Sequence, residues 1–146
     1  KAKRVTGADI SAGMLKLGRE KVARRGMADR ITLIQADSEQ LPFPEATFDA
    51  VTVAFGVRNF EHLARGVREM VRVLRPGGRL ITLDCAWTSP QNPIAKLLIG
   101  LDRGKNVRTP EEYEALARGS FSSVTSVVRT DLNRFPYTHC IMTCQN

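Results

Sequence analysis

The sequence predicts a single α/β domain, residues 1–146, with a mostly parallel β-sheet and an antiparallel pair of strands at its C-terminal end. Three observations lead to this prediction. Strand-like and helix-like segments alternate with short connections, which is typical of right-handed parallel crossovers. Residues 50–55 are almost continuously apolar, as in a strand that is covered on both faces. Two strand-like runs, 124–130 and 136–143, then follow each other without a helix between them.

The first half of the chain contains three expected strands and one helix. The strand-like runs are 4–8, 31–36 and 48–54. Ser11 occupies the N-cap position of a helix that runs to about residue 25, where Gly26 is a plausible C-cap. Met14, Leu15, Gly18 and Val22 can form the inner stripe of this helix. Two prolines make the connector 41–44 rigid and exclude a helix or a central strand there.

The second half continues the alternation. Apolar positions in 61–74 recur at spacings of three and four, which predicts a helix that Pro76-Gly77-Gly78 then stops. A fourth strand, 79–85, follows directly. Further helices are expected at 93–101 and, after the start signal Thr109-Pro110 with two acidic residues, up to residue 118.

Composition excludes several classes of protein. The chain is 42% hydrophobic and 25% charged, which is ordinary for a globular domain, and its net charge is +7. The basic residues fall on expected outer helix faces and are not interleaved with aromatic residues, so we expect no nucleic-acid partner. No apolar run approaches the roughly 20 residues that cross a bilayer, and the start of the chain lacks a secretory apolar stretch. We therefore expect a cytoplasmic protein without an integral membrane segment.

The three cysteines are expected to be buried free thiols. Cys140 and Cys144 on one strand would share a face about 13 Å apart, beyond disulfide reach, and His139 would point to the opposite face. This spacing argues against a zinc site with Cys85, so no metal is expected.

Polar residues follow the expected parallel strands, at the edge where ligands bind in open α/β sheets. Asp9 can accept hydrogen bonds from the two hydroxyls of a ribose, or it can cap the helix that begins near Ser11. Asp37, beside Ser38, can accept from an exocyclic amine such as that of adenine, or it can cap a turn. Two such aspartates on successive strands would bind the two halves of one adenosine. Ile10 and Met14 follow Asp9 and can pack against the base, although core packing is the default for Met14.

Several runs in order carry a family resemblance. They are Val5 to Ser11, Gln35-Ala36-Asp37, Leu41-Pro42-Phe43-Pro44, Phe55-Gly56-Val57-Arg58-Asn59-Phe60 and Arg72 to Gly78. Over about residues 3–83 the sequence resembles the ubiquinone and menaquinone biosynthesis C-methyltransferases, and the Phe-Gly-x-Arg-Asn run is the most family-specific part. The Pro-Gly-Gly turn is common to many class I methyltransferases.

This resemblance implies a Rossmann-like class I fold, with S-adenosylmethionine as cofactor and a small molecule, such as a quinol or another aromatic compound, as methyl acceptor. Asp9 would bind the ribose and Asp37 would lie near the adenine. Beside the sulfonium and methyl would lie the residues at the end of the third strand, Ala54, Phe55 and Gly56. Arg58 and Asn59 would face the cofactor or the substrate; alternatively, they stabilise their loop through backbone carbonyls.

Two departures from the family pattern matter. The family carries, before the position of Val5, a strand and a glycine-rich turn that this chain lacks, and their loss would leave two unpaired sheet edges. We expect the natural protein to be longer, or another segment or chain to supply the strand. Downstream of residue 84, the runs 101–110 and 136–142 resemble a different group of small class I methyltransferases. Residues 86–120 are expected to form an insert that faces the substrate.

Catalysis of methyl transfer depends chiefly on holding the two reactants together in a dry pocket. For a phenolic acceptor, His139 or Tyr137 are weak candidates to assist proton loss; a packed histidine is the commoner situation. Two other functions stay open. One is a catalytically inactive or regulatory domain of the same fold, and the other is a nicotinamide-dependent oxidoreductase, which the absence of a G-x-G-x-x-G run disfavours.

Overall fold

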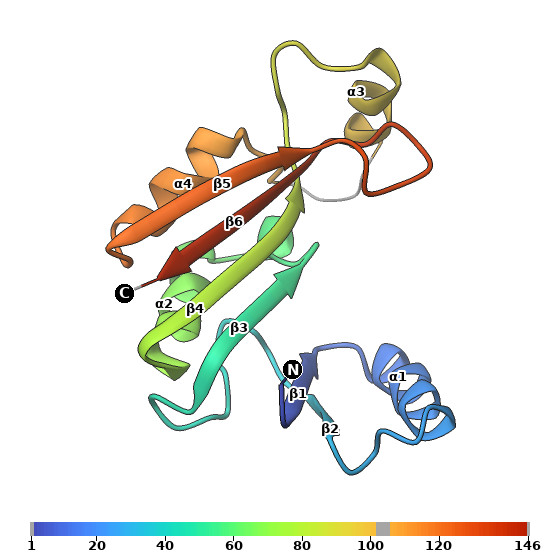
Figure 1. Ribbon diagram of the computed structural model, residues 1–146, viewed down its shortest axis with the longest axis vertical. Helices are drawn as coiled ribbons and strands as arrows, with labels where there is room; N and C mark the ends of the chain where they lie inside the picture. Colours follow the sequence, from blue (N-terminus) through green and yellow to red (C-terminus); the bar gives the residue numbers. More distant parts are fainter. Residues whose placement is uncertain (1, 102–105, 146) are drawn as a thin grey trace. The chain divides into compact units, whose positions relative to one another are not determined.

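The computed structural model describes residues 2–101 and 106–145, and the chain divides into two compact units, Lys1–Pro42 and Phe43–Asn146 (Figure 1). Part of the expected pattern at 101–110 falls on residues 102–105 and lies outside the described residues. Each unit has its own sheet.

The first unit is a β-α-β motif. Strands β1 (Val5–Asp9) and β2 (Ile31–Gln35) pair in parallel and are connected through helix α1 (Ala12–Arg24). The helix begins where the sequence predicts, because the Ser11 hydroxyl accepts a hydrogen bond from the Met14 N–H at 3.3 Å. It ends before Gly26, whose φ of 61° is a backbone conformation that glycine adopts without strain.

The predicted inner stripe of α1 is only partly correct. Leu15 is buried, whereas Met14 is 59% exposed, so core packing is the wrong prediction for Met14. Gly18 lies on the packed side, because a Cβ there would come within 2.7 Å of the Leu33 side chain. A sheet of two strands supports only a narrow strip of the helix, and Met14 falls beside that strip.

The second unit is built on a four-stranded mixed sheet with the order β3-β4-β6-β5. Its strands are β3 (Phe48–Ala54), β4 (Leu74–Cys85), β5 (Ser123–Arg129) and β6 (His139–Gln145). Strands β3 and β4 are parallel, and β6 is antiparallel to both β4 and β5. The C-terminal antiparallel pair is therefore confirmed, but the sheet of this unit has one parallel pairing and two antiparallel ones, so it is not mostly parallel.

Strand β4 begins five residues earlier than predicted. Leu74 already pairs with Phe48, and the register shifts before Ala50 pairs with Arg79. Helix α2 ends at Val73, before the Pro76-Gly77-Gly78 run that was expected to stop it, and this run lies inside strand β4. Gly77 has a φ of 74°, and the extra residues on β4 are those of an irregular, bulged start.

The helices of the second unit are α2 (Leu63–Val73), α3 (Pro93–Gly100) and α4 (Pro110–Arg118), and the 3₁₀ turn η1 (Val57–Asn59) precedes α2. Of these helices, α2 and α4 cover the sheet on the side where its core lies. The predicted start of α4 is confirmed as a reciprocal cap, in which Thr109 and Glu112 each bond the other's backbone N–H.

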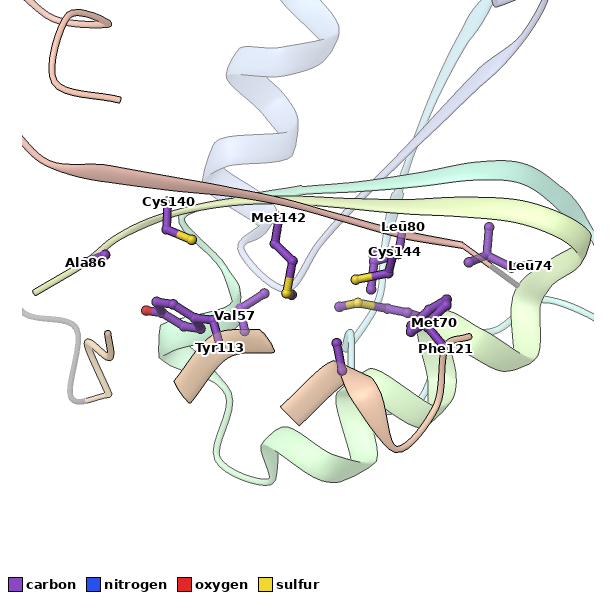
Figure 2. Close-up of a cluster of buried hydrophobic side chains, with 11 residues drawn as sticks. Val57, Met70, Leu74, Leu80, Ala86, Tyr113, Phe121, Cys140, Met142 and Cys144 are labelled. Carbon is purple, nitrogen blue, oxygen red and sulfur yellow. The ribbon is translucent and has the colours of Figure 1, made fainter. Parts of the chain in front are cut away.

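The core of the second unit lies between the sheet and helices α2 and α4 (Figure 2). Alternate residues of β4 and β6 point into it, because successive side chains of a strand lie on opposite faces. It comprises Val57, Met70, Leu74, Leu80, Ala86, Tyr113, Ala117, Phe121, Cys140, Met142 and Cys144.

Among the described residues, β1 pairs with no strand other than β2, and β3 pairs with no strand other than β4. No helix in the described part of the chain is long and apolar enough to cross a membrane.

We predict that Gly78→Ala destabilises the protein by about 1–3 kcal/mol, because an added Cβ would lie 2.8 Å from the Arg75 carbonyl and 3.2 Å from the Asp49 carbonyl. Gly119→Ala is the matched control, since a Cβ there meets nothing within 4 Å. Urea unfolding of both variants measures the difference. Equal stability of the two variants would contradict the close approach at Gly78.

Candidate functional site

In the first unit, the carboxyl end of β1 carries Asp9 at the edge of an open hollow of about 180 Å³. The half-buried Asp9 carboxylate accepts the Ser11 N–H at 2.7 Å, so it holds the turn into α1, as one of the two sequence interpretations proposed. A carboxylate has two acceptor oxygens, and this contact occupies one lone pair of one of them. Ile10 is 70% exposed beside it. The hollow is lined by Gly7, Ala8, Asp9, Met14, Leu15, Gly18 and Leu33.

Asp37, just beyond β2, forms a capped turn. Its carboxylate accepts the Glu39 N–H at 2.8 Å, and its carbonyl accepts the Gln40 N–H at 3.0 Å. Asp37 is exposed and Ser38 is half-buried. Asp9 and Asp37 follow two paired parallel strands, so both lie at the same edge of this small sheet.

In the second unit, the chain leaves β3 in a strained conformation. Phe55 has a φ of 57°, which is rare for a residue with a side chain, and the residue is 38% exposed. Two hydrogen bonds hold it: its N–H donates to the Leu83 carbonyl at 2.7 Å, and the Asn59 amide donates to its carbonyl at 2.8 Å. Asn59 therefore makes a loop-stabilising contact with a backbone carbonyl, which is one of the two roles that the sequence left open for it.

Arg58 forms a buried ion pair with Asp84, which lies near the carboxyl end of the neighbouring strand β4. Their side chains are 10% and 2% exposed, and Nη1 of Arg58 lies 3.5 Å from Oδ1 of Asp84. The Arg58 backbone N–H points at the same oxygen, also at 3.5 Å. The guanidinium carbon lies 5.2 Å from the centre of the Phe55 ring, in a cation–π arrangement.

Burial raises the pKa of Asp84 to about 6. The N–H and charge of Arg58, with the Val57 N–H, oppose that rise but do not cancel it. Asp84 falls near the end of the strand expected at 79–85, but the sequence suggested no role for it. The available signal was a charged residue at a core-facing position of a strand.

His139 lies on the other face of the sheet from Asp84, because it pairs with Cys85 whereas Cys140 pairs with Asp84. The imidazole is 1% exposed, and its ring centre is 5.8 Å from that of Phe55 and 5.1 Å from that of Tyr137. Burial lowers the pKa of His139, against weaker effects of backbone groups of Arg129 and Tyr137. The ring is therefore neutral near pH 7.

The three cysteines are buried free thiols, as the sequence predicts. Burial raises the pKa values of Cys140 and Cys144 to about 11, so both stay protonated near neutral pH. Tyr113 donates its hydroxyl to the Cys85 carbonyl at 3.2 Å, a contact that the sequence did not suggest. In the described ranges, no group of three or more His, Cys, Asp or Glu could hold a metal ion.

A family model describing the ubiE/COQ5 methyltransferase family matches residues 1–96, well over half of the chain. The chain belongs to this family. The match spans the whole first unit and reaches through the Phe55–Phe60 run and β4 into α3.

Curated relatives agree with the family assignment. The sequence is 52% identical over 77 residues to the ubiquinone/menaquinone biosynthesis C-methyltransferase UbiE of Pseudomonas aeruginosa strain LESB58, covering 53% of this chain and 30% of that protein. It is 49% identical over 87 residues to UbiE of Pseudomonas putida, covering 60% and 33%. The chain spans about a third of the length of the curated relatives it matches.

Solved structures show the fold alone. The chain matches YcgJ of Bacillus subtilis with a TM-score of 0.73 at 16% identity, covering 98% of this chain and 80% of that one. It matches the S-adenosylmethionine-dependent methyltransferase SibL with a TM-score of 0.79 at 21% identity, covering 98% and 43%. The [4+2]-cyclase SpnF matches with a TM-score of 0.80 at 18% identity, covering 100% and 68%. The chain therefore has the α/β fold of class I methyltransferases.

We predict that Asp84 makes the protein less stable as the pH rises from about 4 to 6. Its folded-state pKa is raised above the ordinary value of 3.8, so the folded state holds this proton more tightly than the unfolded state does. The free energy of unfolding of the wild type, minus that of Asp84→Asn, should fall across this range and level off above pH 7. Urea unfolding at each pH measures the difference; a difference that rises with pH would contradict the raised pKa.

Proposed function

We propose that the intact protein transfers a methyl group from S-adenosylmethionine to a carbon atom of a quinol or another small aromatic acceptor. The observation that carries this proposal is the family-specific Phe55–Phe60 run at the carboxyl end of β3, where open α/β sheets bind ligands. Family membership over residues 1–96 and the names of the UbiE relatives support the reaction and the acceptor class.

The first unit offers groups that fit the adenosine part of this cofactor. Asp9 borders a hollow whose wall is apolar or glycine, and its carboxylate would accept from the ribose hydroxyls. Ile10, exposed next to it, would pack on the base. Asp37 and Ser38 would contact the adenine amine and ring. When bound, the cofactor supplies a methyl group on a positively charged sulfur.

In the second unit, Ala54, Phe55 and Gly56 would lie beside the sulfonium and methyl. Phe55 presents part of its ring to solvent, and an aromatic face favours a neighbouring cationic group. The two backbone hydrogen bonds at Phe55 fix the direction of this segment. Such preorganisation favours in-line attack, because the reacting groups need little further ordering.

We propose that Arg58 and Asn59 face the acceptor side and that His139 assists proton removal. The ring carbon of a phenolic acceptor forms a bond to the methyl carbon, the carbon–sulfur bond breaks, and its electron pair stays on sulfur. The neutral imidazole of His139 would take the hydroxyl proton. After the attack, the methylated ring carbon would lose its own hydrogen as a proton and the oxygen would regain a proton, which restores the aromatic ring. His139 is 1% exposed, so the rings of Phe55 and Tyr137 that lie near it would have to move before an acceptor could reach the imidazole. Residues 86–120 would form the insert that faces the acceptor.

The free edges of β1 and β3 bear on the same proposal. A parallel strand edge exposes unpaired N–H and C=O groups. We propose that strand segments outside the described residues, from this polypeptide or another chain, pair with these edges in the intact protein. Backbone of that kind would also supply contacts to the methionine end of the cofactor.

We predict that the intact protein binds S-adenosylhomocysteine and that Asp9→Ala weakens this binding about 10- to 100-fold, the effect of losing one or two hydrogen bonds to a charged group. Asp29→Ala is the control, an exposed aspartate of the same unit away from the hollow. Isothermal titration calorimetry measures both variants, with NAD as the competing ligand.

Tight NAD binding without a response to S-adenosylhomocysteine would replace the methyltransferase proposal with an oxidoreductase. Binding without methyl transfer to any quinol or phenol would favour a non-transferring domain, a possibility that the shared fold of the cyclase SpnF makes concrete. Unchanged affinity in Asp9→Ala would show that Asp9 only holds its turn.

A further inference from the structure

We propose that Asp84 is a positioning residue, which holds the Phe55–Asn59 run in the conformation that methyl transfer requires. The contact itself stands on the geometry of the second unit, and its effect on catalysis rests on the proposed function. Asp84 does not belong to the Phe55–Phe60 run: it reaches this run from the neighbouring strand.

The 3₁₀ turn η1 needs an acceptor for its first N–H groups, because no earlier carbonyl is in position to bond them. Its N-cap residue is Gly56, which has no side chain to serve as the acceptor. The Asp84 carboxylate takes this place from the next strand. Its Oδ1 lies 3.5 Å from the Arg58 N–H, and the Val57 N–H also lowers the pKa of Asp84, as a donor to the charged form does.

The same carboxylate holds the Arg58 side chain. Oδ1 is 3.5 Å from the guanidinium Nη1, and the guanidinium in turn lies over the Phe55 ring at 5.2 Å. Asp84 is thus in contact with the backbone and the side chain of Arg58, and through Arg58 it bears on Phe55. At the other end of the run, the side-chain amide of Asn59 donates a hydrogen bond to the Phe55 carbonyl.

The other groups near Asp84 do not replace Val57 and Arg58 as donors to its carboxylate. Tyr113 of α4 faces Asp84, and its pKa is raised by burial and then by the Asp84 charge. Arg108, which precedes α4, lowers the pKa of Tyr113. The pKa of the buried Cys140 thiol on β6 is raised first by burial and in smaller part by Asp84. Oδ2 of Asp84 is buried with no hydrogen-bond partner among the described residues. The donors to Asp84 therefore come from Val57 and Arg58.

Charge on Asp84 is needed for this role, because a neutral acid loses the attraction to Arg58. The pKa of about 6 places the change within reach of ordinary buffers. Below that pH the carboxyl group is protonated and its hold on η1 weakens; above it the run is ordered. Global stability moves the other way, since burying the charge is unfavourable.

Amide hydrogen exchange tests the contact without reference to catalysis. At pH 7.5, Asp84→Asn should exchange the amides of residues 57–59 at least tenfold faster, while amides in the β4–β6 ladder keep their rates. Glu69→Gln is the matched control: it removes the carboxylate of another arginine pair, in which Oε2 of Glu69 lies 2.8 Å from Arg72 of α2, and should leave residues 57–59 unchanged. Equal exchange in the two variants would overturn the proposal.

The wild type gives a second test that does not depend on a variant folding. After correction for the intrinsic rate, exchange of residues 57–59 should accelerate relative to β4 as the pH falls from 7.5 to 5. A flat ratio would also overturn the proposal.

Methyl transfer then tests the consequence in the intact protein. At pH 7.5 the kcat/KM of Asp84→Asn should be at least tenfold below that of the wild type. The kcat/KM of Glu69→Gln should stay within twofold of the wild type. As the pH falls toward 5, the difference in kcat/KM between the wild type and Asp84→Asn should disappear. An active wild type with an unchanged Asp84→Asn profile refutes the positioning role. An inactive wild type refutes the proposed function and leaves the exchange result to decide on Asp84.

Discussion

Strand β4 is hydrogen-bonded along both edges, in parallel to β3 and antiparallel to β6, and the second unit depends on this double pairing. From Arg79 to Leu83 the strand has a partner on each side, so its side chains largely determine what packs on it. Leu80, Thr82 and Asp84 alternate on its core face. Asp84 is the acidic residue among them, and its carboxylate lies in a region that η1 and α4 close off. A carboxylate in that place must find donors, and Arg58 supplies them.

The pair of Arg58 and Asp84 is costly for folding. A 3.5 Å ion pair with one carboxylate oxygen left without a hydrogen bond does not fully offset the loss of hydration, which is why the pKa of Asp84 stays above its ordinary value. Phe55 adds backbone strain directly beside the pair. Strain and buried charge that coincide at the end of one strand are typical of functional sites, where order is kept at the expense of stability.

Sequence patterns predicted the elements well where a local rule decides them. Strand β3 has the predicted limits, Ser11 and Thr109 cap the predicted helices, and Asn59 makes the backbone contact that had been one of two options. The sequence patterns failed where contacts between residues far apart in the chain determine the structure. The early start of β4 depends on Leu74 meeting Phe48, and the exposure of Met14 depends on how many strands support α1. The role of Asp84 requires knowing that η1 lies against the end of β4, and no spacing along the chain encodes that contact.

The part of the chain beyond residue 96 is physically joined to the family-specific run, although the family model does not include it. Tyr113 lies beside Val57 in one core, and its hydroxyl donates to the carbonyl of Cys85, the residue after Asp84 (Figure 2). On the opposite face, His139 touches the Phe55 ring. Both faces of the sheet near Phe55 are therefore completed by residues that lie beyond the family match. A change of sequence there alters the surroundings of the Phe55–Asn59 run without altering the run itself.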